Sequence, residues 1–273
     1  MKKILALVAL FALVAGTAWA GSVEIKGSTT VLPFMQKVVD HFQKSNPDMA
    51  ISLSGGGSSN GAKALIDGTC DIAMMSRDMK GKEADAAKAN GREPVQFVVA
   101  YDCIVPVVNP ANPVKDISTE QLMNIYLGKT TNWKDLGGKD AEIVVISRDT
   151  SSGTYDCWKD KIMGKDANGE HNKVFPGASL LASNGAVAQA VSKNPQAIGY
   201  VGLAYVNAEL KGLSVNGISA SVKTALDKSY PISRGLNCYT VGEPAGDVKT
   251  IMDFIMSPAG QKLAEEVGYI PVK

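Results

Sequence analysis

Residues 143–155 read I-V-V-I-S-R-D-T-S-S-G-T-Y, which predicts a strand, a loop and a helix in turn. β-branched apolar residues come first, Arg148 and Asp149 follow, and five small residues, 150–154, lead into a helix expected from Tyr155. A loop of small residues between a strand and a helix collects backbone N–H groups and the positive end of the helix at one point. This stretch therefore predicts an anion-binding loop.

Two other parts of the chain repeat this pattern. The segment 27–30 follows an expected strand over 22–26, and the glycine- and serine-rich segment 55–61 follows an expected strand over 49–53. Helical spacing of apolar residues follows each loop. A strand–helix alternation of this kind predicts an α/β fold with a parallel or mixed sheet, whose ligand loops gather at the carboxyl ends of the strands. We expect the three loops to converge on one tetrahedral oxyanion.

The remaining pattern indicates two lobes. Further strands are expected over 71–75, 96–108, 198–201 and 231–242, and further helices over 117–126, 186–191 and 247–267, the last broken at 257–258. The segment between 79 and 95 reads as a polar connection. We expect one lobe to hold residues 21–106 and 235–273 and the other to hold 107–234, with two crossings that form a hinge.

The net charge and the N-terminal segment argue against several classes of protein. The net charge of +1 argues against a nucleic-acid-binding surface, so a small anion has to be held by local groups. Residues 1–20 carry two lysines, an apolar run over 4–14 and an A-x-A site at 18–20, which predicts a signal peptide and export of the remaining chain to the periplasm as a soluble protein. A retained anchor is the alternative, but the apolar run is short for a span.

Four cysteines remain after the predicted cleavage, and they allow three complete pairings. If the chain crosses twice, the strands that hold Cys103 and Cys238 run side by side and a disulfide between them is feasible. The alternative is that both are buried small hydrophobes, and the pairing of Cys70 and Cys157 stays open. The two histidines are far apart and no C-x-x-C occurs. No metal site and no cofactor are expected.

The segment 57–61, G-S-S-N-G, also matches the G-x-S-x-G nucleophile elbow of serine hydrolases. In that alternative the protein is an exported esterase with Ser59 as nucleophile. A catalytic triad needs a histidine, and the one that follows, His171, lies in a polar stretch that reads as an exposed loop, whereas His41 lies in a predicted helix. The hydrolase is therefore the less favoured reading, and no P-loop sequence supports a nucleotide site.

A series of motifs along the chain resembles the periplasmic phosphate-binding proteins of ABC phosphate importers. The motifs are G-S-T-T-V-L-P at 27–33, G-G-G-S-S at 55–59, C-D-I-A at 70–73, S-R at 76–77, N-W-K-D-L-G-G at 132–138, R-D-T-S-S-G-T at 148–154, A-I-G-Y-V at 197–201, Y-P-I-S-R at 230–234 and G-Y-I-P at 268–271. The resemblance implies a two-lobed class II periplasmic-binding-protein fold that closes on its ligand. It further implies a monomer without enzyme activity that binds inorganic phosphate with high affinity and delivers it to an ABC permease at the inner membrane.

The resemblance also implies a set of ligand groups. They are the hydroxyl of Thr29, the backbone N–H of Thr30, Ser58, the guanidinium of Arg148, and the donors Ser152, Gly153 and Thr154 at a helix start. From its position next to Arg148, and not from the resemblance, Asp149 is expected to hold the guanidinium in place. Arsenate, molybdate or sulfate on the same fold is an alternative to phosphate.

One position departs from the family pattern. After the third strand, well-known members carry an aspartate that accepts the proton of hydrogen phosphate and repels sulfate, which has none. Here Ser76 stands there, followed by Arg77. Asp102 is our candidate for the proton acceptor and Arg77 for a second cation at the anion; the alternative for both is a structural ion pair near the hinge.

Overall fold

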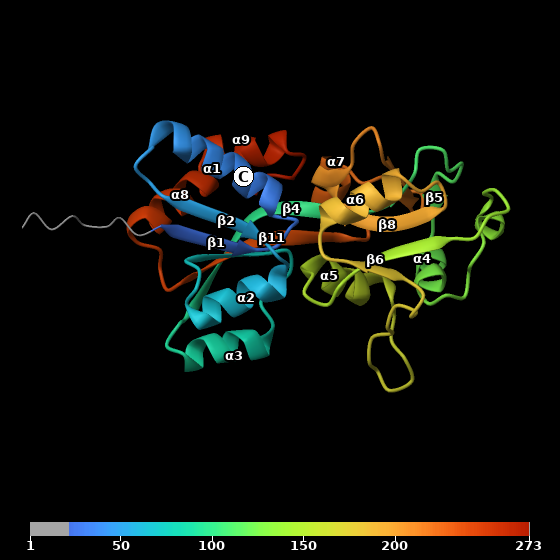
Figure 1. Ribbon diagram of the computed structural model, residues 1–273, viewed down its shortest axis with the longest axis horizontal. Helices are drawn as coiled ribbons and strands as arrows, with labels where there is room; N and C mark the ends of the chain where they lie inside the picture. Colours follow the sequence, from blue (N-terminus) through green and yellow to red (C-terminus); the bar gives the residue numbers. More distant parts are fainter. Residues whose placement is uncertain (1–21, 273) are drawn as a thin grey trace, which may run out of the picture.

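Two neighbouring antiparallel strands, β4 (Pro94–Val108) and β11 (Ser233–Val241), lie at the centre of the computed structural model and link its two halves (Figure 1). The structure describes residues 22–272, so the predicted signal peptide lies outside the described part. None of the helices described combines the length and hydropathy that a membrane span requires.

The main sheet is mixed and continues through both halves. Its strand order is β2-β1-β3-β11-β4-β8-β6-β7, with β9 (Lys211–Gly212) also paired to β4. In the first half β1 (Val23–Gly27) pairs in parallel with β2 (Ile51–Gly55) and β3 (Ile72–Met75). In the second half β6 (Val144–Arg148) pairs in parallel with β7 (Ser179–Leu181) and β8 (Ala197–Gly202). The expected α/β class is confirmed.

Helices cover both faces of each half. Figure 1 shows α1, α8 and α9 on one face of the first half and α2 and α3 on the other, while α6 and α7 oppose α4 and α5 in the second half. The bounds are α1 Leu32–Ser45, α2 Ser58–Asp67, α3 Gly81–Ala89, α4 Thr119–Tyr126, α5 Gly153–Ile162, α6 Asn184–Ser192, α7 Val222–Leu226, α8 Gly246–Met256 and α9 Pro258–Glu266. The smaller elements are β5 (Asp116–Ile117), which pairs with β10 (Ser214–Val215), and the 3-10 turns η1 (Trp133–Leu136) and η2 (Leu203–Tyr205).

The expected break at 257–258 is confirmed, because Ser257 ends α8 and caps α9 by accepting the N–H of Gly260, with Pro258 in the first turn. Helix α3 was not expected. Its sequence, G-K-E-A-D-A-A-K-A, buries only Ala87, so it has no apolar stripe for periodicity to detect. At the start of the helix, the Glu83 carboxylate accepts the backbone N–H of Lys80 at 2.9 Å.

Each half has its own hydrophobic core. The first core includes residues from Val23 to Ala100 and from Leu236 to Tyr269, and the second includes residues from Cys103 to Ile232. Strand β4 therefore leaves one core and enters the other within three residues, and β11 makes the return.

The expected disulfide between Cys103 and Cys238 is wrong, although their strands do run side by side. The antiparallel register places Cys103 opposite Ser233 and Cys238 opposite Phe97, so about 20 Å of strand separates the two thiols. A disulfide needs Cα atoms within about 7 Å. All four cysteines are free thiols; Cys157 is half-buried and the other three are buried.

Candidate anion-binding site

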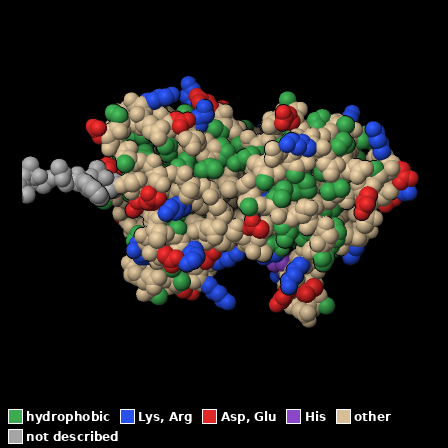
Figure 2. Space-filling view, viewed as in Figure 1, with side chains coloured by type: hydrophobic (Ala, Val, Ile, Leu, Met, Phe, Trp, Pro, Cys, Tyr) green, Lys and Arg blue, Asp and Glu red, His purple; other side chains and the backbone are tan. Residues whose placement is uncertain are grey.

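The β1–α1, β2–α2 and β6–α5 loops meet where the two halves face each other, and the start of α6 joins them. Eight polar side chains there are each no more than 7% exposed. They are Thr29, Thr30, Ser58, Ser76, Arg148, Ser152, Thr154 and Asn184. Charges of both signs are interspersed on the face that Figure 2 shows.

Glycines allow the loops to come this close. A Cβ on Gly27, whose φ is +136°, would lie 2.2 Å from the carbonyl oxygen of Met74 on β3. A Cβ on Gly153 would lie 2.2 Å from Ser58 Oγ across the boundary between the halves. Ser59 N–H also donates to the carbonyl of Ser151 at 3.0 Å. The loops of the two halves are thus in direct contact.

Arg148 ends β6 with its guanidinium buried at the centre of this cluster. Its Nε donates to the carbonyl of Leu181 at 2.9 Å and its Nη2 to that of Ala182 at 3.0 Å, but Nη1 is buried without an acceptor among residues 22–272. No carboxylate of the described residues lies within 4.0 Å of it as an ion-pair partner, and Asp149 instead accepts the N–H and hydroxyl of Ser151. Burial lowers the pKa of Arg148 because it disfavours the charged form. The site holds a cation with an unused donor.

The two threonines lie over the first residue of α6. Thr29 Oγ1 accepts from Asn184 Nδ2 at 3.1 Å and from Arg148 Nη2 at 3.4 Å. Thr30 Oγ1 contacts Asn184 Nδ2 at 3.0 Å and Thr154 Oγ1 at 2.8 Å. The backbone N–H of Thr30, expected as a ligand donor, donates to Ser28 Oγ at 3.1 Å.

Sequence reasoning missed Asn184. A signal exists, because residues 179–185 read S-L-L-A-S-N-G, a short strand and small residues before a helix, as in the other three loops. The strand is only three residues long, which is too short for alternation to identify.

Three serines form a chain beside the threonines. Ser28 Oγ donates to Ser76 Oγ at 2.9 Å, Ser76 N–H donates to Ser58 Oγ at 3.0 Å, and the hydroxyls of Ser58 and Ser76 are 3.3 Å apart. On the facing half, Ser152 caps α5 by accepting the N–H of Tyr155 at 3.2 Å. Gly153 follows Ser152 as the first residue of the helix.

The first turn of α5 also brings backbone donors to the site. The N–H groups of Gly153 and Thr154 have no acceptor within the described part of the chain. Unpaired N–H groups at a helix start are suited to an anion.

Asp102 lies behind the threonines, on the hinge strand β4. Its Oδ2 accepts from Arg234 Nη2 at 2.8 Å and Nε at 3.1 Å, and its Oδ1 accepts from Leu203 N–H at 2.9 Å. The pair joins residues that are opposite each other in the β4–β11 register. Burial raises the pKa of Asp102, and Arg234 and the Leu203 N–H oppose that rise.

Arg77 is held by carboxylates and by Ser59 beside the anion loops, and it makes no hydrogen bond to Thr29, Thr30 or Ser58. Its Nε donates to Asp156 at 2.8 Å, and its Nη atoms donate to Glu83 at 2.7 and 2.8 Å and to Ser59 Oγ at 3.0 Å. Lys80 Nζ also lies 2.8 Å from Asp156. Because Asp156 belongs to α5, these ion pairs connect the two halves beside the site.

The arrangement around Ser59 does not form a catalytic triad. Ser59 Oγ accepts from Arg77, whereas His171 lies 3.3 Å from Asp160 and His41 stacks on Phe254 at 4.2 Å. No histidine of the described residues hydrogen-bonds to Ser59, and those residues contain no group of three or more His, Cys, Asp or Glu placed to hold a metal ion.

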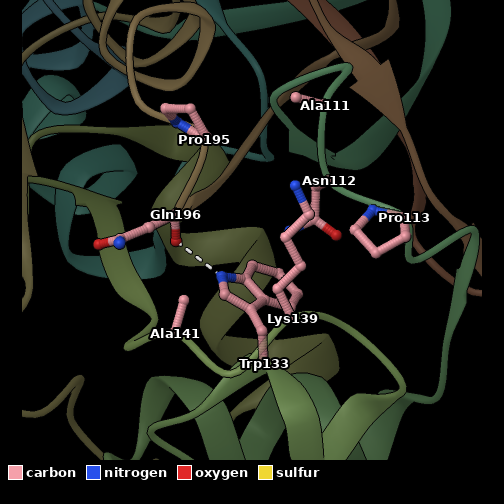
Figure 3. A pocket seen from close by; sticks show the side chains of 8 residues that line it. All are labelled: Ala111, Asn112, Pro113, Trp133, Lys139, Ala141, Pro195 and Gln196. Carbon is pink, nitrogen blue, oxygen red and sulfur yellow. Dashed lines mark hydrogen bonds between the residues drawn. The ribbon is translucent and has the colours of Figure 1, made fainter.

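A separate cavity of about 140 Å³ lies in the second half beside η1 (Figure 3). Trp133 fills one wall, and its indole N–H donates to the carbonyl of Gln196 at 2.8 Å. Its lining includes none of the anion-loop residues.

Comparisons with known proteins agree with this arrangement. A family model described as a PBP superfamily domain matches residues 14–259. The phosphate-binding protein PstS of Borreliella burgdorferi is 33% identical over 92% of this chain and 90% of its own length. A crystal structure from Clostridium perfringens, described as a phosphate ABC transporter substrate-binding protein with bound phosphate, is 36% identical with a TM-score of 0.84 and covers 93% of this chain and all of that one. An ABC-type phosphate transport receptor from Vibrio cholerae is 31% identical with a TM-score of 0.72 and covers 91% of this chain and 99% of that one.

Proposed function

Because the chain belongs to the PBP superfamily and, within it, to the PstS-type phosphate-binding proteins, we propose that it binds inorganic phosphate and delivers it to an ABC-type phosphate permease. These relatives are substrate-binding proteins and not enzymes, and they have the class II periplasmic-binding-protein fold. Delivery takes place in the periplasm, from a monomer whose leader is the predicted signal peptide.

One observation carries the proposal. Arg148 is a fully enclosed cation with an unused donor at Nη1 and no carboxylate partner among residues 22–272. An enclosed charge of this kind is costly unless a counter-charge arrives, and a phosphate oxygen supplies both the charge and the acceptor. The unpaired N–H groups at the start of α5 point to the same ligand.

The predicted ligand residues take two roles in this proposal. The groups that contact phosphate are Thr29, Ser58, Ser76, Arg148, Gly153 and Thr154. Thr30 and Ser152 hold neighbouring loops in place, Asp102 neutralises Arg234, and Arg77 ties the two halves together through Asp156.

We also propose that the two halves are lobes that close on the anion, with 21–106 and 235–273 in one and 107–234 in the other. The separate cores support this division, because β4 and β11 pass from one core to the other at residues that are paired in the sheet. Two adjacent crossing strands allow the lobes to rotate about them.

Calorimetric titration of the mature chain tests the function, after bound anion has been removed by unfolding, dialysis and refolding. We expect saturable one-to-one binding of phosphate, a rise in the thermal unfolding midpoint, and weaker binding of sulfate, molybdate and arsenate. Tighter binding of another oxyanion would assign the site to that anion, and no binding of any would reject it. Turnover of a model ester that Ser59→Ala abolishes would favour the hydrolase instead.

A further inference from the structure

Asn184 determines which way the threonine hydroxyls point. Its Oδ1 accepts the N–H of Gly202 at 3.2 Å, which fixes the orientation of the amide. Its Nδ2 therefore faces Thr29 Oγ1 at 3.1 Å and Thr30 Oγ1 at 3.0 Å as a donor. Asn184 is fully buried, so no water competes for these contacts.

Both threonines consequently have no acceptor capacity left. A hydroxyl has two acceptor positions and one proton. Thr29 Oγ1 accepts from Asn184 and Arg148, and Thr30 Oγ1 accepts from Asn184 and from Arg234 Nη2 at 3.3 Å. Each can only donate its proton, and Thr30 gives its proton to Thr154 Oγ1, which releases the Thr154 proton for the ligand.

Hydrogen phosphate differs from sulfate at this point. Three of its oxygens accept hydrogen bonds, but the fourth carries a proton that needs an acceptor. Asp102 is occupied, because Arg234 and the Leu203 N–H bind its two oxygens on the hinge side. The acceptor has to come from elsewhere in the pocket.

The serine pair Ser58–Ser76 has one acceptor position left. Ser58 Oγ accepts one fixed donor, the Ser76 N–H, and Ser76 Oγ accepts one fixed donor, the hydroxyl of Ser28. The hydrogen bond between the two hydroxyls fills one further position, whichever of them donates. The pair then offers one open acceptor and one unused proton, on different serines, which matches a protonated and an unprotonated oxygen of one phosphate.

We propose that the Ser58–Ser76 pair accepts the proton of hydrogen phosphate in place of a carboxylate, while Asn184 keeps the threonines as donors. This inference rests on the proposed phosphate function. Neutral hydroxyls turn to donate when no proton is offered, so this site admits sulfate more readily than a carboxylate site does.

The test is the ratio of the sulfate and phosphate Kd values at pH 8, measured by calorimetry on the full mature chain. We expect Ser76→Ala to lower the ratio about 10-fold, through weaker phosphate binding. Hydrogen phosphate needs both a donor and an acceptor from the serine pair and loses one of them, whereas sulfate needs donors only and keeps that of Ser58. Ser59→Ala is the matched control. Ser59 follows Ser58 on α2, but its hydroxyl accepts from Arg77, so we expect this variant to leave the ratio unchanged. Asn184→Ala weakens both anions alike, because both use the threonine donors.

Other outcomes would overturn the inference. An equal loss of affinity for both anions in Ser76→Ala, which leaves the ratio unchanged, would be one, and equal affinities of the wild type for phosphate and sulfate would be another. A ratio that collapses in Asp102→Asn would assign the proton acceptor to Asp102. If Ser76→Ala does not fold, Ser58→Ala removes the other half of the pair and is read in the same way. Failure of the wild type to bind phosphate rejects the proposed function, whereas phosphate binding with an unchanged ratio rejects this inference alone.

Discussion

Two buried arginines lie on either side of the threonines, and their surroundings differ in one respect. Arg234, on the hinge strand β11, is paired with the carboxylate of Asp102, whereas Arg148, at the end of β6, has only carbonyl and hydroxyl partners within residues 22–272. Both reach a threonine hydroxyl. The charge of Arg234 is neutralised by the protein itself, whereas that of Arg148 has no carboxylate partner within residues 22–272, and we propose that a ligand neutralises it.

This difference explains why two enclosed cations are compatible with one anion site. A buried ion pair is roughly neutral in its net effect on stability, but breaking it leaves a costly charge. Arg234 therefore belongs to the structure of the hinge in every arrangement of the lobes. In the proposed function, Arg148 gains its counter-charge only when the anion is bound and the lobes are closed.

The largest effect is expected for Arg148→Met, which removes the unneutralised side of the comparison. We expect phosphate affinity to fall about 1000-fold, because a desolvated charge-assisted contact is lost. Calorimetry measures the loss, and the melting curve without phosphate checks that the fold survives. Arg92→Met, a change at a half-buried arginine outside the anion loops, is the control; equal losses in both variants would contradict the role of Arg148.

The next effect is expected for Asp102→Asn, which leaves Arg234, like Arg148, without a carboxylate partner. A second enclosed cation without a partner lowers the free energy of unfolding by about 3 kcal/mol. Urea unfolding in phosphate-free buffer measures this change. Added phosphate still stabilises the variant, because the ligand donors remain. An unchanged unfolding free energy would mean that the pair does not neutralise the hinge.

A smaller effect is expected for Asp156→Asn, which weakens the ion pairs that connect the halves. Arg77 and Lys80 both contact this carboxylate at 2.8 Å. We expect the closed form to be less favoured and phosphate to dissociate about 10-fold faster, as stopped-flow competition measures. Asp160→Asn, one turn further along α5 and 60% exposed, leaves the rate unchanged. Equal dissociation rates in both variants would show that these ion pairs do not stabilise the closed form.

The last prediction concerns the uncharged groups around both arginines. Burial raises the pKa of the Cys103 thiol, next to Asp102, and of the Tyr205 hydroxyl, which donates to the Thr29 carbonyl, each to about 12. Because these values exceed those of the unfolded chain, about 9 and 10, the folded state keeps protons that the unfolded state loses. The stability is present in full below pH 9 and falls between pH 9 and 12. Urea unfolding at pH 8, 10 and 11 measures the fall; equal values would contradict it.

Much of the fold could be predicted, because strands, helices and small-residue loops alternate with clear periods. Helix α3 could not, since its alanines and charges show no apolar period. The disulfide expectation failed for a related reason. That two strands are neighbours does not determine their register, and here the register moves Cys238 opposite Phe97.

Within the site, local composition identified the loops but not the charge pairs. Thr29, Ser58 and Arg148 stand at strand–helix junctions, which a sequence displays directly. Asp156, which pairs with Arg77 across the two halves, is 79 residues away, and Arg234, which pairs with Asp102, is 132 residues away, so no local pattern connects these pairs. Only the pair between Arg77 and Glu83 is local. Which arginine is neutralised is a property of the tertiary structure alone.

The way β4 and β11 connect the cores also affects how the protein can be rebuilt. The second half of the molecule is one continuous segment of chain between β4 and β11. It begins and ends at residues that are opposite each other in the sheet, Cys103 and Ser233. Its two ends therefore lie side by side, as the ends of an inserted cassette do. A related second lobe could be exchanged at these two positions and would bring its own version of Arg148 to an unaltered set of threonines and serines. Chimaeras that combine halves of different relatives could then change the ligand preference. The Asp102–Arg234 ion pair at the junction would have to be kept in each chimaera.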